Sequence, residues 1–308
     1  MNDDEKRAES RARGLYWDRA LSYVEGCSPV SAGCRNCWAA AQTKMRAAQS
    51  NPKIVMRYHG LNRADGAFNG CVRVMDEALN VPTSTKIPTV FCVWNDLFHP
   101  GVEDDAVRAL LGVAAHCPRH TFLILTKRPE RMAAFFAKEG AGYHPLPNVW
   151  LGTTIEEQQF VDRLDWLMQC PAAGHWVSVE PMLGSLQLTG EVGLFKHRPG
   201  LALDAVVCGG ETGRGARPMH PDWPLELAKE MEGARIPFLF KGWGEWCPES
   251  VANSVQAAKS ALYVERDGAT RPAARGPRGQ AVTVQRVGRQ AAGRHLGGIL
   301  YDTLPWYE

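Results

Sequence analysis

Three cysteines in one loop are the residues whose types and spacing point most directly to chemistry. Cys27, Cys34 and Cys37 lie in a stretch rich in Gly, Pro and Ser, and only two residues separate the last pair. A Cys-x-x-Cys pair lets two thiolates converge on one metal centre, and the surrounding turn residues allow the third thiolate to join them. Three thiolates without a fourth ligand suit an iron–sulfur cluster that keeps one iron open to another ligand. The loop therefore predicts an iron–sulfur site.

Two other interpretations of the loop stay open. A structural zinc ion normally takes four ligands at short spacing, but the next candidates, His59 and Cys71, lie far beyond that spacing. A zinc site would therefore need a ligand from a remote part of the chain. Otherwise the three cysteines are ordinary reduced thiols in a loop.

Apolar runs of strand length alternate with helical patterns along most of the chain. The predicted strands cover residues 17–24, 89–94, 121–126, 148–152, 175–179, 204–208 and 237–240. The predicted helices between them cover residues 104–116, 128–138, 158–170 and 223–233. Continuous apolar runs are typical of strands covered on both faces in a parallel sheet. The alternation predicts an α/β fold, a complete or partial parallel (β/α) barrel, with a doubly wound sheet as the alternative.

Polar side chains follow nearly every predicted strand. The carboxyl ends of parallel barrel strands meet at one edge, where the βα loops build the active site. The cysteine loop follows the first predicted strand and would open onto the same edge. We therefore expect one shared cofactor-binding site there. Its candidate residues are Asn95, Asp96, Lys127, Glu180, Gly209, Gly210, Glu211 and Lys241.

The expected roles of these residues follow from their charges. The carboxylates suit an ammonium group or hydroxyls of a ligand, and they are Asp96, Glu180 and Glu211. The cations suit a carboxylate or a phosphate, and they are Lys127, Arg128 and Lys241. Backbone N–H groups of the glycine-rich run 209–215 would face an anionic or zwitterionic ligand. The simpler alternatives are a helix N-cap for Asp96 and a flexible turn for the glycine run.

Length and composition limit the class of protein. The chain has 308 residues, 45% of them hydrophobic, which is enough for one α/β barrel or two modest domains. Its formal net charge is only +2, so the overall balance does not indicate a nucleic-acid binder. The cysteines outside the loop show no pairing pattern, and the chain opens with charged residues instead of a signal peptide. No apolar run reaches membrane-spanning length, and we expect a cytoplasmic protein without membrane association.

The last sixty residues differ in character from the rest. Between Arg266 and Arg294 the chain carries seven arginines and one acid, Asp267. A loop of this kind contacts phosphates or serves only to keep the protein soluble. Residues 281–284 are predicted to form a strand, and residues 288–300 a short helix. We expect a barrel domain over residues 1–247 and a basic C-terminal extension over residues 248–308, packed on the barrel.

The motifs together resemble a known family. The Gly-Cys-x6-Cys-x2-Cys loop is similar to that of the three-cysteine-motif proteins of phage, prophage and bacterial genomes, which are radical-SAM-like. The same resemblance extends over segments 95–99, 125–132, 147–152, 179–184, 209–213, 216–219, 240–246 and 287–294. Radical-SAM enzymes more often have a Cys-x3-Cys-x2-Cys loop with an aromatic residue before the last cysteine. In this chain Trp38 instead follows Cys37.

The resemblance implies a radical-SAM-type barrel in which Cys27, Cys34 and Cys37 hold a [4Fe–4S] cluster. It implies that S-adenosylmethionine binds the open iron and is cleaved reductively to a 5′-deoxyadenosyl radical. An electron donor such as flavodoxin or ferredoxin is then the expected partner. The phage context of the family and the basic tail favour a nucleobase in DNA or RNA as the substrate. The alternative is a non-catalytic zinc- or iron–sulfur-binding protein that acts in a phage–host interaction.

Overall fold

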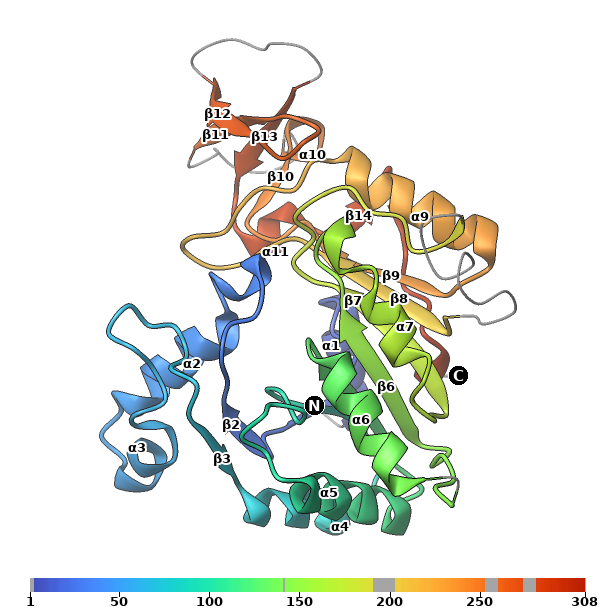
Figure 1. Cartoon of the computed structure of the whole chain (residues 1–308). Helices are drawn as coiled ribbons and strands as arrows, with labels where there is room; N and C mark the ends of the chain where they lie inside the picture. The colour runs from blue at the N-terminus through green and yellow to red at the C-terminus, as the bar shows by residue number, and fades with distance from the viewer. Residues whose placement is uncertain (1–2, 141, 191–202, 253–259, 274–280, 308) are drawn as a thin grey trace. The chain divides into compact units, whose positions relative to one another are not determined.

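The computed structural model describes residues 3–140, 142–190, 203–252, 260–273 and 281–307 (Figure 1). Its contacts divide the chain into two units. The first unit comprises Met1–Arg11, Leu15–Thr154 and Arg163–Trp176, and the second comprises Ala12–Gly14, Ile155–Asp162 and Val177–Glu308. The predicted boundary between residues 247 and 248 falls inside strand β10 (Trp246–Pro248) of the second unit.

Seven strands form the main sheet, in the order β1-β4-β5-β6-β7-β8-β9. Their bounds are β1 Arg19–Leu21, β4 Val90–Val93, β5 Thr121–Thr126, β6 Val149–Thr154, β7 Gly174–Val179, β8 Ala205–Gly209 and β9 Phe238–Gly242. The pairs β1–β4, β4–β5, β5–β6 and β8–β9 run parallel. The α/β class and the seven strands are therefore confirmed. The strand order begins at β1 and ends at β9, and closure into a complete radical-SAM barrel stays a prediction.

The first unit covers its strands with helices α4 (Asn80–Ser84), α5 (Asp104–His116), α6 (Pro129–Glu139) and α7 (Arg163–Leu167). Helix α5 buries Val107, Leu110, Leu111 and Ala114, the spacing that places apolar side chains on one helix face. The predicted helices at 104–116 and 128–138 are confirmed. The predicted helix at 158–170 is confirmed only over α7. Only a 3-10 turn, Gln158–Phe160, and the short α7 form there.

A small substructure surrounds the cysteine loop in the first unit. Strand β2 (Val24–Gly26) leads into the loop and pairs antiparallel with β3 (Val72–Val74). Helices α2 (Trp38–Ala47) and α3 (Pro52–Tyr58) lie between these strands in the sequence and pack on each other (Figure 1). The segment 51–85 also contains α4 and a 3-10 turn, Asp76–Leu79.

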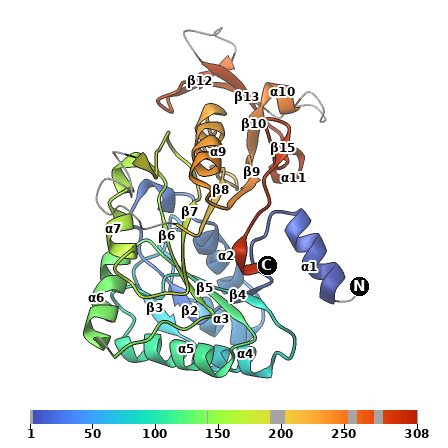
Figure 2. The same cartoon turned by 90° about the vertical axis from the view of Figure 1, so that its right-hand side faces the viewer.

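The second unit adds an antiparallel sheet in the order β10-β13-β11-β12, with helix α10 (Glu249–Ala252) beside it (Figure 2). Its new strands are β11 Ala261–Val264, β12 Thr270–Pro272 and β13 Val282–Arg286. They enclose a cluster of buried apolar residues, Ala216, Trp246, Val264 and Val284. Helix α9 (Asp222–Ala234) confirms the predicted helix at 223–233, and β13 confirms the predicted strand at 281–284.

The predicted helix at 288–300 is wrong. A four-residue helix, α11 (Arg289–Ala292), is followed by a hairpin of β14 (His295–Leu296) and β15 (Ile299–Leu300). Gly297 and Gly298 have φ of 60° and 84°, which a two-residue hairpin turn requires and a helix excludes.

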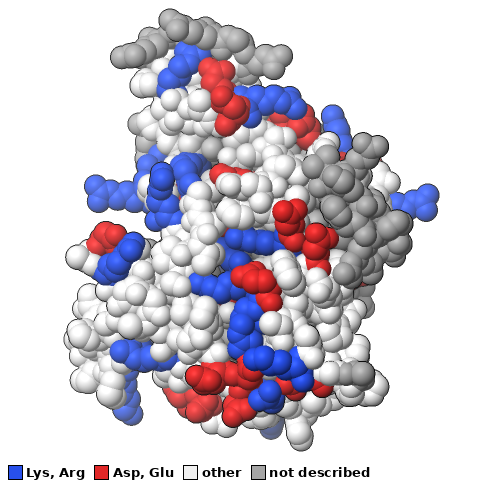
Figure 3. Space-filling model, in the orientation of Figure 1, with Lys and Arg blue, Asp and Glu red and all other residues white. Residues whose placement is uncertain are grey.

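Basic and acidic side chains are interspersed on the face of the molecule shown in Figure 3. This agrees with the formal net charge of +2. Among the helices within the described ranges, none is both long enough and apolar enough to cross a lipid bilayer.

Candidate functional site

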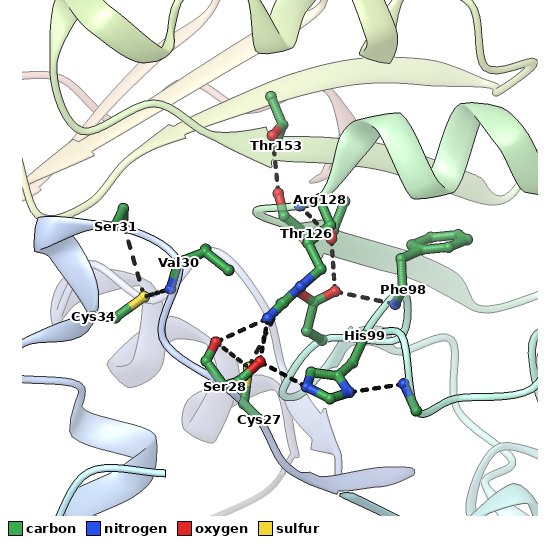
Figure 4. Close-up of polar contacts among 12 residues, drawn as sticks. Cys27, Ser28, Val30, Ser31, Cys34, Phe98, His99, Thr126, Arg128 and Thr153 are labelled. Atoms are coloured by element: carbon green, nitrogen blue, oxygen red, sulfur yellow. Dashed lines mark hydrogen bonds and ion pairs between the residues drawn. The ribbon is translucent and has the colours of Figure 1, made fainter. Parts of the chain in front are cut away.

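The cysteine loop lies in the first unit, between β2 and α2, with all three thiols partly exposed. The backbone N–H of Val30 donates to Cys34 Sγ at 3.5 Å, and Ser31 Oγ lies 3.7 Å from the same sulfur (Figure 4). Cys37 stands directly before α2, at the position of its N-cap. The loop thus presents one thiol at a helix start and another that already accepts an N–H hydrogen bond.

A buried ion pair of Asp96 and Arg128 supports the first cysteine (Figure 4). The two side chains are only 8% and 6% exposed, and Arg128 Nη1 donates to Asp96 Oδ2. The same nitrogen lies 3.8 Å from Cys27 Sγ. Arg128 Nη2 donates to the carbonyl oxygen of Ser28 at 2.9 Å and to its hydroxyl at 2.8 Å. One guanidinium therefore joins the ends of β4 and β5 to the start of the cysteine loop.

Asp96 is held in place by neighbouring hydrogen bonds. Its Oδ1 accepts from Thr126 Oγ1 at 2.6 Å and from the Phe98 N–H at 3.0 Å. Thr126 in turn accepts through its carbonyl oxygen from Thr153 Oγ1 at 2.9 Å, at the end of β6. The polar residues that end β4, β5 and β6 therefore come together in the first unit.

His99 extends this network on the other side of Ser28. The Gly101 N–H donates to His99 Nδ1 at 3.1 Å, so the neutral ring carries its proton on Nε2 and donates it to Ser28 Oγ at 2.8 Å. Burial lowers the pKa of His99, and the nearby Arg128 cation lowers it further. The structure thus places a neutral imidazole at the cysteine loop, on a residue that is not among the predicted site residues.

Burial and charge act in opposite directions on the thiols. Burial raises the pKa of Cys27 to about 12, Asp96 adds to the rise, and Arg128 opposes it. Burial also raises the pKa of Cys37, while the backbone of Ala40 and Ala39 and the Lys127 cation oppose the rise. The charge of a Cys34 thiolate also raises the pKa of both of these thiols. Metal binding, which needs thiolates, would gain from the cations already present.

Asn95 has a positioning function within the first unit. Its φ of 58° is a left-handed conformation that few residues other than glycine adopt. Its Nδ2 donates to the Val24 carbonyl at 2.7 Å and to Glu25 Oε2 at 3.2 Å. Glu25 is buried and also accepts from Arg57 Nε at 2.9 Å. Asn95 thereby ties the end of β4 to β2, two residues before Cys27.

The second unit holds the remaining candidate residues in two ion pairs. Lys241 Nζ lies 2.7 Å from Glu180 Oε1, with side chains 28% and 16% exposed. Ser178 Oγ donates to the other oxygen of Glu180 at 3.3 Å. This pair, at the ends of β7 and β9, joins a carboxylate and an ammonium group that water still reaches.

Glu211 is bound more tightly than Glu180. Its Oε2 accepts from the backbone N–H of Arg217 at 2.8 Å and from Arg217 Nε at 2.9 Å, and its Oε1 accepts from Nη2 at 2.6 Å. The Glu211 side chain is only 4% exposed. This arrangement gives Glu211 a structural role, that of closing the loop after β8 onto Arg217.

Glycines of the run 209–215 allow neighbouring backbone segments to pack closely. A Cβ atom on Gly210 would lie 2.0 Å from the Trp243 carbonyl oxygen, so only glycine fits there. The Gly210 N–H donates to the Gly242 carbonyl at 2.9 Å, and the Gly213 N–H donates to Glu245 Oε1 at 3.2 Å. Gly209 also packs closely, since a Cβ there would lie 3.3 Å from Glu180 Oε1. The backbone N–H groups of Gly210 and Gly213 therefore already donate hydrogen bonds within the protein.

Four of the five tail arginines that the structure describes, all but Arg289, have carboxylate partners. Arg266 pairs with Glu226 and Asp222, and Arg271 pairs with Glu265. Arg286 pairs with Glu245, and Arg294 with Asp302. Arg275 and Arg278, which were part of the predicted basic loop, lie outside the described residues. The described part of the tail is thus charge-compensated.

These observations define an α/β protein with two clusters of polar residues at the ends of parallel strands, one of them carrying a three-cysteine loop. The chain belongs to the family described as "Protein of unknown function (DUF5131)", which matches residues 14–305. No curated protein and no solved structure matches the chain. Its function is therefore argued from the two clusters themselves.

Proposed function

We propose that this protein is a radical-SAM-type enzyme whose cysteine loop holds a [4Fe–4S] cluster through Cys27, Cys34 and Cys37. The observation that carries the proposal is the support given to the loop. A buried guanidinium binds Ser28 and lies 3.8 Å from Cys27 Sγ. A loop of ordinary thiols has no need for a buried ion pair, which is costly to desolvate.

The donor set fits a cluster better than a closed zinc site. The sulfurs receive N–H and guanidinium donors, the hydrogen bonds that commonly tune cluster potentials. The described residues contain no group of three His, Cys, Asp or Glu side chains already positioned to hold a metal ion. Cys27, Cys34 and Cys37 would hold the cluster, and the fourth iron would stay open to another ligand.

When bound, a [4Fe–4S] cluster with S-adenosylmethionine supplies an electron for reductive cleavage to a 5′-deoxyadenosyl radical. Arg128 fixes the first arm of the loop, and Asp96 fixes Arg128. Lys127 places a further cation near Cys37. These cations would stabilise the thiolate form of the cysteines, which is the form that binds iron.

In the second unit, Glu180 and Lys241 are the residues that we assign to a zwitterionic ligand. Each is partly exposed, and they offer a carboxylate and an ammonium group to the charged groups of such a ligand. Glu211, being bound on both oxygens by Arg217, would support the loop instead of contacting the ligand. From the sequence, both glutamates were expected to bind a ligand, and the proposal now assigns ligand binding to Glu180 alone.

The test is the metal content of anaerobically purified protein. We expect about four irons and four sulfides per chain and a brown colour for the wild type, as for a [4Fe–4S] protein. Cys34→Ala should lose them, while Cys71→Ala, which removes an exposed cysteine outside the loop, should retain them. Absence of iron after reconstitution in the wild type would contradict the proposal.

One observation favours a second candidate, a structural zinc protein. His99 reaches the loop through Ser28 and would supply the fourth ligand that a Cys3His zinc site requires. One zinc per chain in the wild type, lost in both Cys34→Ala and His99→Ala, would establish this alternative. If the loop instead holds a [4Fe–4S] cluster, the His99→Ala variant should still bind iron, because His99 is not one of its ligands.

A further inference from the structure

We propose that the surface formed by α2, α3 and β3 binds single-stranded nucleic acid. Phosphates would lie at a hollow lined by Lys53, Arg57 and Arg73, and a base would stack on Trp38. The binding surface stands independently of the cluster. Its use to bring a nucleotide to the cysteine loop rests on the proposed function.

This part of the first unit is strongly basic although the whole chain is nearly neutral. Residues 35–75 contain seven cations and one acid, Asp65. The cations are Arg35, Lys44, Arg46, Lys53, Arg57, Arg63 and Arg73. A basic surface on one part of a protein is the usual electrostatic footprint of nucleic-acid binding. Of these cations, Arg57 pairs with Glu25 and Arg63 pairs with Asp65.

A hollow of about 530 Å³ lies on this surface. Its cations are Lys53, Arg57 and Arg73, and its apolar walls are Ile54, Met56 and Met75. Met56 is 74% exposed, which is unusual for a large apolar side chain in water. Glu77 also borders the hollow and lies 3.7 Å from Arg57 Nη1. Three cations beside exposed apolar groups match a ligand that has both phosphates and apolar faces.

Neighbouring residues hold these cations in fixed positions. Arg57 Nε donates to Glu25 Oε1 at 2.9 Å, and Arg57 Nη2 donates to the Ser22 carbonyl at 2.5 Å. Arg73 Nη1 donates to the Arg57 carbonyl at 2.9 Å. No carboxylate among the described residues pairs with Lys53. Glu25 and Glu77 compensate the charge of Arg57, so the positive charge that a phosphate would meet in the hollow comes from Lys53 and Arg73.

Arg46 joins the hollow to α2. The guanidinium groups of Arg46 and Arg57 both lie over the Tyr58 ring, at 5.1 Å and 5.6 Å from its centroid. Arg46 Nη1 also donates to the Tyr58 hydroxyl at 2.5 Å. The basic surface is therefore continuous from the hollow to the last turn of α2.

Trp38 provides an aromatic surface at the other end of α2. Its side chain is 51% exposed, and its ring packs edge-on against Trp94 with centroids 4.7 Å apart. Met45, seven residues later and 60% exposed, lies on the same face of the helix. Trp38 and Arg46 are about 12 Å apart along the helix axis. Exposed aromatics beside a basic track are how proteins bind single strands without base-specific hydrogen bonds.

The test is fluorescence anisotropy of a labelled single-stranded oligonucleotide, as DNA and as RNA, titrated with the full-length protein at several KCl concentrations. The logarithm of the binding constant falls as the logarithm of the salt concentration rises, and for single strands each phosphate contact contributes about 0.7 to the steepness of that fall. Lys53→Gln/Arg73→Gln should therefore make the slope shallower by about 1.4. Trp38→Ala should weaken binding about tenfold at constant salt and leave the slope unchanged. Arg275→Gln/Arg278→Gln removes the same charge from the tail and is the matched control.

Several outcomes would overturn the inference. These are no binding at low salt, wild-type slopes in Lys53→Gln/Arg73→Gln, or loss of binding in the tail variant instead. Equal binding of polyglutamate, unaffected by Trp38→Ala, would also overturn it and indicate an acidic protein partner. The same titration on Cys34→Ala separates the two proposals. Cys34→Ala should lose its iron and still bind the oligonucleotide, because the surface does not depend on the cluster. Oligonucleotide binding by a wild type that takes up no iron on reconstitution would contradict the proposed function alone.

Discussion

Arg128 Nη1 lies 3.8 Å from Cys27 Sγ while the same nitrogen donates to Asp96. The side chain thus links a metal-ligand candidate to a carboxylate buried at the end of a strand. Its second nitrogen, Nη2, binds both oxygens of Ser28. This use of a planar fork with several donors is specific to arginine and cannot be reproduced by a lysine ammonium.

Asp96→Asn should destabilise the protein strongly, because it leaves the Arg128 cation buried without a counter-charge. Breaking a buried ion pair by removing one partner costs about 3–5 kcal/mol. Urea unfolding followed by circular dichroism measures the change. Asp105→Asn is the matched control, since Asp105 is 93% exposed and pairs with Arg108 on the surface. If Asp105→Asn lowered the free energy of unfolding as much as Asp96→Asn does, the buried ion pair would not have the predicted importance.

Arg128→Lys should keep the fold but loosen the cysteine loop. The ammonium can replace the contact with Asp96 but not the two hydrogen bonds to Ser28 as well. Hydrogen exchange of the peptide spanning residues 27–37 should therefore become faster, with exchange in β5 unchanged. Arg108→Lys serves as the control on a surface helix. Unchanged exchange in the loop would show that Arg128 does not hold it.

Asn95→Gly and Asn95→Ala separate the two roles of Asn95. Both remove the hydrogen bonds to Val24 and Glu25, but only alanine must also adopt the φ of 58° against steric repulsion. Alanine should therefore be less stable than glycine by about 1 kcal/mol in the free energy of unfolding. Equal stability of the two variants would exclude backbone strain at this position.

The two glutamates of the second unit should respond differently to neutralisation. Glu211→Gln removes a buried charge that binds Arg217 three times, and it should cost about 3 kcal/mol. Glu180→Gln should cost about 1 kcal/mol, since one partly exposed ion pair is lost. Only Glu180→Gln is expected to weaken S-adenosylmethionine binding in equilibrium dialysis without unfolding the protein. A larger loss of stability in Glu180→Gln would reverse these assignments.

Much of the fold could be predicted from the spacing of apolar residues. The seven strand-length runs correspond to strands of the main sheet, because buried parallel strands need continuous apolar sequences. The spacing of Val107, Leu110, Leu111 and Ala114 likewise predicted α5. The hairpin at Gly297-Gly298 was missed, although two glycines between short apolar pairs are a turn signal.

The site could be predicted only in part. The positions of Asp96 and Arg128 at strand ends predicted that polar groups gather there, but not that these two charges bind each other. The pairing of Glu211 with Arg217 was equally invisible, because the sequence shows which charges are present and not their distances. His99 is not among the predicted site residues, and only the fold shows its contact with Ser28.

The most direct test of the central claim measures 5′-deoxyadenosine. Anaerobically reconstituted protein is incubated with S-adenosylmethionine and dithionite, and the product is quantified by mass spectrometry against Cys34→Ala and Cys71→Ala. The account predicts 5′-deoxyadenosine from the wild type and from Cys71→Ala, and none from Cys34→Ala although it remains folded. Equal product from Cys34→Ala, or none from a wild type that holds stoichiometric zinc instead of iron, would contradict it.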